Sequence, residues 1–271
     1  MRAALAILIA ALRITAVAED PLKLSFVSEN RHVVPGQTFS VGLFQQIEKG
    51  YHSYWRNPGT VGLGMSVEWK LPKGFTAGEI QWPTPEVGKM AAYDIWGYHN
   101  EAFLVVDITP PSNLKPGTQI TLKGAAVWMC CAKSCFPDYQ EISLTLPVAR
   151  STKANPKWTH RFARTRAEQP VPSGSWRLSC QFARGKYQLA ISAADKKTEI
   201  PENIRFFDYD RQVSSEKGQR IKRRKQSLVV TMHPEEHTGE EHPRLRGILV
   251  ADTEWQPGAK VIAVDIPIQG R

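Results

Sequence analysis

Residues 120–147 read ITLKGAAVWMCCAKSCFPDYQEISLTLP. Apolar and polar residues alternate around Leu122 and again around Leu144, which is the period of a half-buried β-strand. Three cysteines lie between these two runs, and Pro147 ends the second run. The stretch therefore predicts two strands that are joined by a cysteine-bearing loop.

Similar short apolar runs precede this stretch. They occupy residues 22–26, 39–43, 67–69 and 103–108. Turn residues such as Pro35 and Gly36 separate them, and short strands at this spacing indicate an antiparallel β-sandwich. Residues 50–59, GYHSYWRNPG, hold too many aromatic and turn residues to form a regular strand along their whole length.

A second β pattern follows a stretch of different character. Asn155 and Pro156 suit the start of a short basic helix, because asparagine caps helices and proline fits their first turn. Strand-like runs then return at residues 176–182, 187–191, 228–232, 245–251 and 261–266. We expect an all-β protein with one sandwich at 19–149, a helical linker at 150–174 and a smaller sandwich at 175–271.

Residues 1–18 have the features of a signal peptide. Arg2 supplies a positive start, residues 3–12 are apolar, and Ala16-Val17-Ala18 is a cleavage signature. The apolar run is much shorter than the roughly 20 residues of a membrane span, and no later run approaches that length. We expect a bacterial periplasmic or secreted protein without stable membrane insertion.

The 271-residue chain carries a net charge of +9, much of it in residues 153–166 and 217–225. The second run is interpreted either as a polyanion site or as a solvated hairpin or edge strand, where basic side chains discourage aggregation. No nucleic-acid motif with stacking aromatics accompanies it, so we expect no nucleic-acid binding.

Cys131 and Cys135 are the candidate reactive residues, and three interpretations of them stay open. A tight turn can place their Cα atoms within the roughly 4.4–6.8 Å of a disulfide, but so small a ring adds little stability as a staple. Lys133 lies between them and favours the thiolate that attacks in disulfide exchange. The alternatives are a structural disulfide and a metal site. The sequence near the cysteines has no histidine and no second Cys-x-x-Cys to complete a metal site, so we expect no metal and no cofactor.

Several motifs resemble one family. Residues 128–137 read Trp-x-x-Cys-x-x-x-Cys-x-Pro and, with residues 141–148, look like the N-terminal periplasmic domain of the DsbD/ScsB thiol–disulfide reductases. Further similar motifs lie at 50–59, 62–63, 71–75 and 80–85. The resemblance covers residues 22–148 closely and continues more weakly through 204–207 and 245–268.

The resemblance implies immunoglobulin-like sandwiches and a redox role. The chain would pass reducing equivalents to or from thioredoxin-like periplasmic proteins through Cys131 and Cys135, in electron transfer related to cytochrome c biogenesis. Longer family members continue into a membrane domain and a thioredoxin domain, so we expect a stand-alone form served by a separate membrane reductase. The resemblance leaves open whether the chain is itself an enzyme of the protein-disulfide reductase type. The alternative is a non-enzymatic secreted β-sandwich binding module with a structural disulfide.

The same family covers its cysteines with a loop. Tyr93, Trp96 and Tyr98 lie in a loop-like segment and are candidate shields, with ordinary packing as the alternative. Lys133 and Pro137 complete the expected supporting residues.

Other cysteines and histidines carry weaker signals. Cys130 stands where the family usually has an apolar residue, and a strained Cys130–Cys131 disulfide is disfavoured. Cys180 falls on the apolar face of a predicted strand, which predicts a buried free thiol. Met232, His233, His237 and His242 match no defined metal-site spacing, so we expect a solvated acidic loop.

Overall fold

The structure is a computed structural model that describes residues 20–195, 198–236 and 242–271. The predicted signal peptide at 1–18 and His237 lie outside these residues. The elements are β1 (Leu22–Ser28), β2 (Phe39–Ile47), β3 (His52–Gly59), β4 (Ser66–Lys70), β5 (Thr76–Ala77), β6 (Glu86–Met90), β7 (Tyr93–His99), β8 (Glu101–Thr109), β9 (Gln119–Cys131), β10 (Cys135–Pro147), α1 (Thr159–Ala167), β11 (Trp176–Ala183), β12 (Lys186–Ala193), β13 (Ile204–Asp208), β14 (Arg220–Arg224), β15 (Ser227–Met232), β16 (Arg244–Ala251) and β17 (Val261–Gln269).

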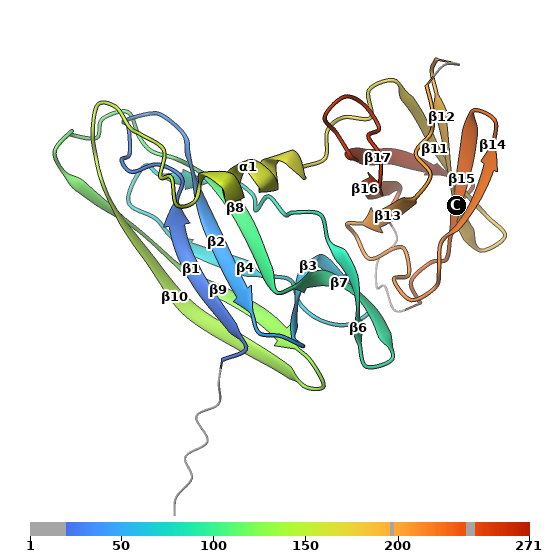
Figure 1. The fold of residues 1–271 in the computed structure, drawn as a ribbon, viewed down its shortest axis with the longest axis horizontal. Coiled ribbons are helices and arrows are strands. Elements are labelled where there is room, and N and C mark those ends of the chain that lie inside the picture. The colour runs from blue at the N-terminus through green and yellow to red at the C-terminus, as the bar shows by residue number, and fades with distance from the viewer. Residues whose placement is uncertain (1–19, 196–197, 237–241) are drawn as a thin grey trace, which may run out of the picture.

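Strands β1 to β10 form two sheets that enclose a common core (Figure 1). One sheet has the order β1-β2-β8-β5, and the other has the order β10-β9-β3-β7-β6 with β4 added beside β9. Leu43 and Leu104 from the first sheet and Trp128 from the second are fully or almost fully buried in this core. The alternation of apolar residues thus produced the predicted all-β, sandwich-like layers.

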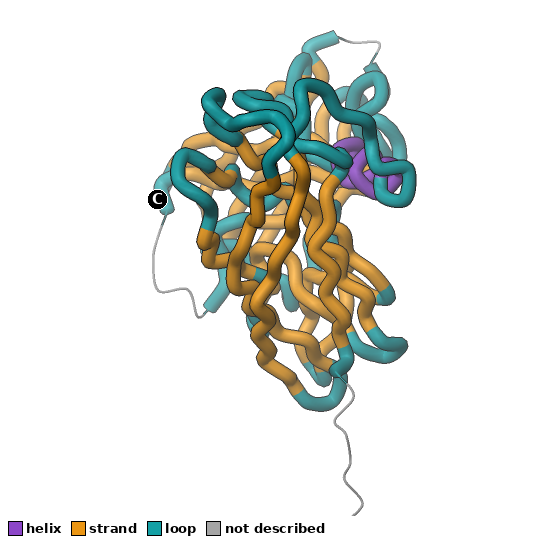
Figure 2. The backbone as a smooth tube through the Cα atoms, turned by 90° about the vertical axis from the view of Figure 1, so that its left-hand side faces the viewer, coloured by secondary structure: helices purple, strands orange, loops and turns teal. Residues whose placement is uncertain are grey.

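Strands β11 to β17 form a third sheet with the order β13-β16-β17-β11-β12-β15-β14. Strand β17 pairs with β16 along its first part and with β11 only near its end, so this sheet closes over its own core. Cys180 lies in that core as a buried free thiol, as predicted. Figure 2 shows strands running through both parts of the molecule, with loops at their ends. These sheets support the proposed division into domains at 19–149 and 175–271.

The basic run at 217–225 contains the edge strand β14, which pairs only with β15. The structure therefore places this strand at an exposed edge of the sheet, which is compatible with both interpretations of the basic run. At the opposite edge of the same sheet, the side chain of Gln219 occupies the place of a neighbouring strand. Its amide nitrogen donates to the carbonyl of Phe206 at 2.6 Å, and its amide oxygen accepts from the Phe206 N–H at 3.0 Å.

Helix α1 covers the outer face of the β1-β2-β8-β5 sheet. Phe162 packs edge-on against Phe103 at 4.9 Å, and the Thr165 hydroxyl donates to the Phe103 carbonyl at 2.7 Å. The predicted cap at Asn155 was wrong by three residues, because Trp158 is the N-cap. The Asn155 carbonyl instead accepts the Trp158 N–H in a turn that precedes the helix.

Strand β3 connects the third sheet to the first two. Its pairing with β7 shifts register between Tyr54 and Gly59, which confirms that residues 50–59 are not a regular strand. Trp55 in this irregular part contacts Phe207 of β13 with ring centroids 6.0 Å apart, and the Asn57 amide donates to the Asp208 carbonyl at 2.7 Å. Phe207 thereby joins the core of the first two sheets.

The Asp208 side chain is fully buried at this junction. Burial raises the pKa of its carboxyl to about 7, although the N–H groups of Val213 and Gln212 donate to it and favour the charged form. A carboxyl with a raised folded-state pKa binds its proton more tightly in the folded than in the unfolded chain. Its stabilising contribution is therefore complete below about pH 4 and is lost as the pH rises to about 7.

We predict that Asp208→Asn, which has no such titration, gains stability relative to the wild type as the pH rises from about 4 to about 7. Thermal unfolding followed by circular dichroism at several pH values measures the difference in Tm. The exposed Asp265→Asn variant is the control and should track the wild type. Parallel profiles for Asp208→Asn and the wild type would refute the proposed protonation.

Candidate functional site

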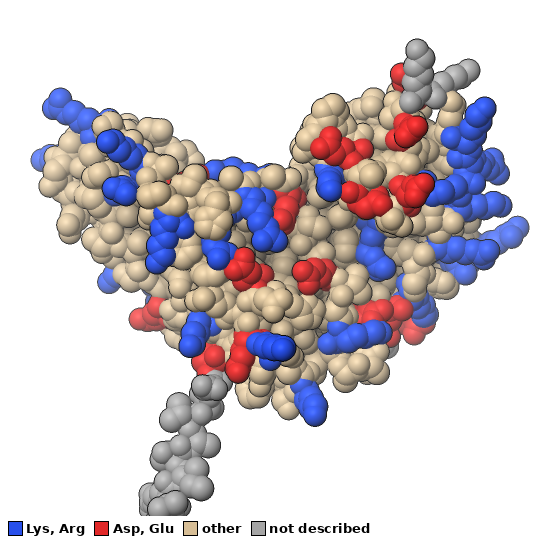
Figure 3. All heavy atoms as spheres, in the orientation of Figure 1, with Lys and Arg blue, Asp and Glu red and all other residues tan. Residues whose placement is uncertain are grey.

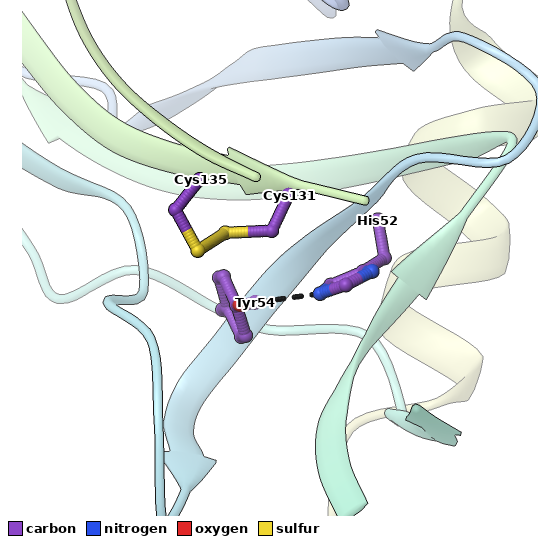
Figure 4. The surroundings of a disulfide bond; sticks show 4 residues. All are labelled: His52, Tyr54, Cys131 and Cys135. Atoms are coloured by element: carbon purple, nitrogen blue, oxygen red, sulfur yellow. Dashed lines mark hydrogen bonds between the residues drawn. A yellow bond between two sulfur atoms is a disulfide. The ribbon is translucent and has the colours of Figure 1, made fainter. Parts of the chain in front are cut away.

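Cys131 and Cys135 form a disulfide at the tip of the β9–β10 hairpin (Figure 4). Cys131 ends β9, Cys135 begins β10, and the two are partners in the strand register with Cα atoms 4.2 Å apart. A three-residue loop joins them, in which the Ala132 N–H donates to the Ser134 carbonyl at 3.0 Å. The sheet register therefore holds the two sulfurs together.

The two cysteines differ in exposure. Cys131 has 0% exposed surface, whereas Cys135 is exposed. Cys131 packs in a small cluster with Tyr54 and Ile95, and the partly buried Val61, Met90 and Met129 border it. The Cys135 side is therefore the more open approach to the disulfide for a thiol or thiolate of another protein.

His52 and Tyr54 form a polar pair beside the disulfide (Figure 4). The Nε2 atom of His52 lies 3.1 Å from the Tyr54 hydroxyl, and both side chains are buried. Burial, with a smaller effect of His99, lowers the pKa of His52 to about 4. Burial, with a smaller effect of Cys130, raises the pKa of Tyr54 to about 12. Both groups are therefore uncharged at neutral pH, and the surroundings of Cys131 carry a hydrogen-bonding pair without a net charge.

Sequence reasoning missed Tyr54 and Ile95 and derived no role for His52. One signal was present: His52 and Tyr54 are two residues apart, so they share a face if the segment is a strand. What the sequence did not show is that β3 lies next to β9, with His52 opposite Cys131.

Cys130 lies on the other face of β9. It is 1% exposed, packs in the main core and is a free thiol. Burial is the main cause that raises its pKa to about 12, and the negative charges of Asp20 and Glu48 add to it. Cys130 therefore stays a protonated thiol, and it is directed away from the Cys131–Cys135 bond.

The predicted supporting residues fall into two groups. Lys133 is exposed in the loop between the two cysteines, and Pro137 is exposed opposite Met129. Tyr93 is 44% exposed at the β6–β7 turn, where it pairs with Met90. The roles of these three residues stay predictions.

Trp96 and Tyr98 lie in the main core instead of in the cluster around Cys131. Trp96 packs edge-on against Phe207 at 5.3 Å, and the Tyr98 hydroxyl donates to the Pro83 carbonyl at 2.8 Å. Ile95, which directly precedes Trp96 in the sequence, is the β7 residue that packs in the Cys131 cluster. Their proposed shielding role stays a prediction, and the packing favours the alternative that they are core residues.

Metal ligation has no candidate among the residues that the structure describes. No group of three or more His, Cys, Asp or Glu side chains is arranged to hold an ion there. Within residues 20–195, 198–236 and 242–271, no helix has the length and apolar character that a membrane span requires.

Fold and site together define an all-β protein with an accessible disulfide at a hairpin tip. Residues 23–147 match the family described as "Thiol:disulfide interchange protein DsbD, N-terminal", and this segment is a domain of that family. The match and the cysteine pair support a role in thiol–disulfide interchange in general. A search of curated proteins finds no match.

Solved structures add a comparison of fold over nearly the whole chain. The N-terminal periplasmic domain of ScsB from Proteus mirabilis superposes with a TM-score of 0.67 at 17% identity, covering 95% of this chain and 97% of that one. The periplasmic chaperone SfaE covers 90% of this chain and 100% of its own at 8% identity, with a TM-score of only 0.24. The first comparison shows that the likeness in fold extends over the third sheet as well.

We predict that Cys130→Ala leaves disulfide exchange unchanged, because the Cys130 thiol lies on the core face of β9. The variant should lose about 1 kcal/mol of unfolding free energy, as is typical for a small core deletion. The rate of reduction by dithiothreitol and a denaturant unfolding curve measure the two effects. A rate change of more than a few-fold in a folded Cys130→Ala protein would show that this thiol takes part.

Proposed function

We propose that this protein exchanges disulfides with thioredoxin-like proteins through Cys131 and Cys135. The observation that supports the proposal is the unequal exposure of the two cysteines, with Cys135 exposed and Cys131 buried. A disulfide that serves only as a staple needs no open sulfur, and this one closes a ring of only five residues. The domain family of residues 23–147 supports the same chemistry.

In the reducing direction for this chain, the thiolate of a partner attacks the Cys135 sulfur. The Cys131–Cys135 bond breaks, its electron pair goes to the Cys131 sulfur, and a mixed disulfide joins the partner to Cys135. The second thiolate of the partner then attacks the partner's own sulfur in the mixed disulfide and releases Cys135. The chain gains two electrons and two protons, and the partner's dithiol becomes a disulfide.

The same steps run in reverse when this chain reduces a partner. The Cys135 thiolate attacks the partner's disulfide, and Cys131 resolves the mixed disulfide. The difference between the two reduction potentials sets the direction. Solvent exposure favours the thiolate on Cys135, because Cys131 is surrounded by the largely apolar cluster around Tyr54.

Tyr54 is suited to assist the enclosed sulfur. It packs in the same cluster as Cys131, and its hydroxyl stays protonated at neutral pH because its pKa is about 12. A protonated hydroxyl can donate a hydrogen bond to a departing thiolate, and His52 holds that hydroxyl at 3.1 Å. We propose Tyr54 and His52 as positioning residues for Cys131.

An apolar strip extends from the disulfide along the outer face of the hairpin. It consists of the paired residues Met129 and Pro137, followed by Val127 and Tyr139, all on the same face as Cys131 and Cys135. Val127 is 36% exposed and Tyr139 is 53% exposed. Exposed apolar residues in a contiguous row mark contact surfaces, so we propose that the strip receives the partner during exchange.

The proposed setting is the bacterial periplasm or another exported location. The apolar N-terminal segment at 1–18 and the periplasmic origin of the ScsB domain of similar fold support this setting. A separate membrane reductase would then supply electrons to this chain, and thioredoxin-like proteins would receive them.

We predict that Cys131→Ala traps a mixed disulfide with a thioredoxin-like partner through Cys135, because the accessible nucleophile remains and the resolving thiol is gone. Cys135→Ala should trap little, because Cys131 is enclosed. Non-reducing electrophoresis with mass spectrometry identifies the joined cysteines.

If neither variant captures such a partner, the exchange proposal fails. A glutathione titration gives an independent measurement. A reduction potential above about −300 mV supports exchange, whereas a more negative, inert bond indicates the structural-disulfide alternative.

We predict that Val127→Ser combined with Tyr139→Ser slows reaction with a thioredoxin-like partner by about tenfold, since an exposed aromatic contact is lost. Stopped-flow kinetics with the partner and with dithiothreitol measure the two rates. The small thiol needs no docking surface, so its rate should not change. Thr145→Ser, further along the same strand, is the control. Equal slowing with both reductants would place the effect on the disulfide and not on docking.

A further inference from the structure

The third sheet has an open face that the exchange chemistry does not use. Strands β11, β12, β15 and β14 lie side by side, and alternate residues of each strand point away from the core. The outward residues pair in three rows, Arg177–Ser192–Ser227–Arg224, Ser179–Ala190–Val229–Lys222 and Gln181–Gln188–Thr231–Arg220. We call these twelve residues the basic face.

The centre of the basic face is hollowed. Small side chains at the middle of its first two rows, such as Ser192 and Ala190, leave a shallow hollow of about 430 Å³. Arg177 borders the hollow on one side, and Lys222 and Arg224 border it on the other. Long cationic side chains thus surround a floor of small ones.

The charge of this face is of one sign. It holds four cations, at Arg177, Arg220, Lys222 and Arg224, and no carboxylate. None of the four forms an ion pair with a carboxylate of the described residues. Figure 3 shows Lys and Arg gathered on the side of the molecule where Figure 1 places β14. Alternate residues of one strand have Cα atoms about 6.6 Å apart, so Arg220, Lys222 and Arg224 of β14 form a regular array of positive side chains.

Protection of an exposed edge explains only part of this arrangement. Basic residues on β14 do discourage strand pairing at that edge. Arg177, however, lies on β11, which β12 and β15 separate from β14, so its charge does not protect the β14 edge. Edge protection also gives no reason for small residues at the centre.

We propose that the basic face binds the phosphate groups of an anionic phospholipid surface. Four cations spread over a four-stranded face can contact several headgroups at once, and each cation near such a surface adds attraction that salt weakens. The twelve residues include no aromatic side chain that could stack on a base, which disfavours single-stranded nucleic acid. They also include no large apolar side chain to insert between lipids, so the binding is electrostatic and reversible.

The basic face and the disulfide lie on different parts of the molecule. The basic face belongs to the third sheet, whereas the disulfide lies on the hairpin of another sheet, β9–β10. Contact of the basic face with a membrane therefore leaves Cys135 open to partners. Membrane binding and disulfide exchange rest on different residues and can fail independently.

The test is sedimentation of the full chain with vesicles of phosphatidylcholine that contain about 20% phosphatidylglycerol. The variant is Lys222→Glu with Arg224→Glu, and the control is Lys73→Glu with Lys115→Glu, which changes the net charge equally at exposed sites elsewhere. Wild type and control should bind. The basic-face variant should bind at least about tenfold less, and about 0.5 M NaCl should release the wild type.

Equal binding by the basic-face variant and the control, or equal binding to vesicles of phosphatidylcholine alone, would overturn the proposal. Tighter binding to a single-stranded oligonucleotide than to vesicles would assign the face to nucleic acid instead. Complete displacement by about 10 mM inorganic phosphate would indicate a small-anion pocket and not a membrane surface. Arg177→Gln, which leaves the edge strand unchanged, should weaken binding in the same direction and guards against misfolding of β14.

Discussion

The period of two along β9 is the constraint on which the site depends. Neighbouring residues of a strand point to opposite faces, so Cys130 enters the core while Cys131 joins the hairpin disulfide. Thirteen paired positions between β9 and β10 hold that register. A slip of one residue would exchange the environments of Cys130 and Cys131 and would place the wrong sulfur opposite Cys135. The long apolar hairpin, and not the short loop, therefore determines which thiols can react.

The local alternation of apolar and polar residues was sufficient to predict most of this architecture. Alternating residues predicted the strands, and the cysteine spacing placed the pair on a turn between two of them. The site was harder to predict in full. Tyr54 reaches Cys131 only because β3 lies between β9 and β7, and that neighbourhood joins segments nearly eighty residues apart. From the sequence, Trp96 and Tyr98 are candidates either for shielding or for ordinary packing, and alternation along β7 directs them into the core and leaves Ile95 for the cysteine cluster.

The packing of the third sheet on the first two has no local signal at all. It depends on the contacts of Phe207 with Trp55 and Trp96. Nothing in the sequence around Phe207 distinguishes it from the apolar residues of any other strand. The irregular segment of β3 makes this packing possible. Trp55 and Asn57 both lie within its register shift; Trp55 packs in the core, and Asn57 donates a hydrogen bond to Asp208 at the junction. The same strand therefore lines the disulfide at one end and joins the two parts of the molecule at the other.

The Gln219 amide at the edge of β13 has a consequence for self-association. Because it satisfies both backbone groups of Phe206, a strand from another molecule finds no free donor and acceptor at that residue. Head-to-tail pairing of sheets into a fibre requires both edges of every copy, so a blocked β13 edge leaves only pairing between two β14 edges, which ends at a dimer. One side chain can thus limit polymerisation without any change to the opposite, basic edge.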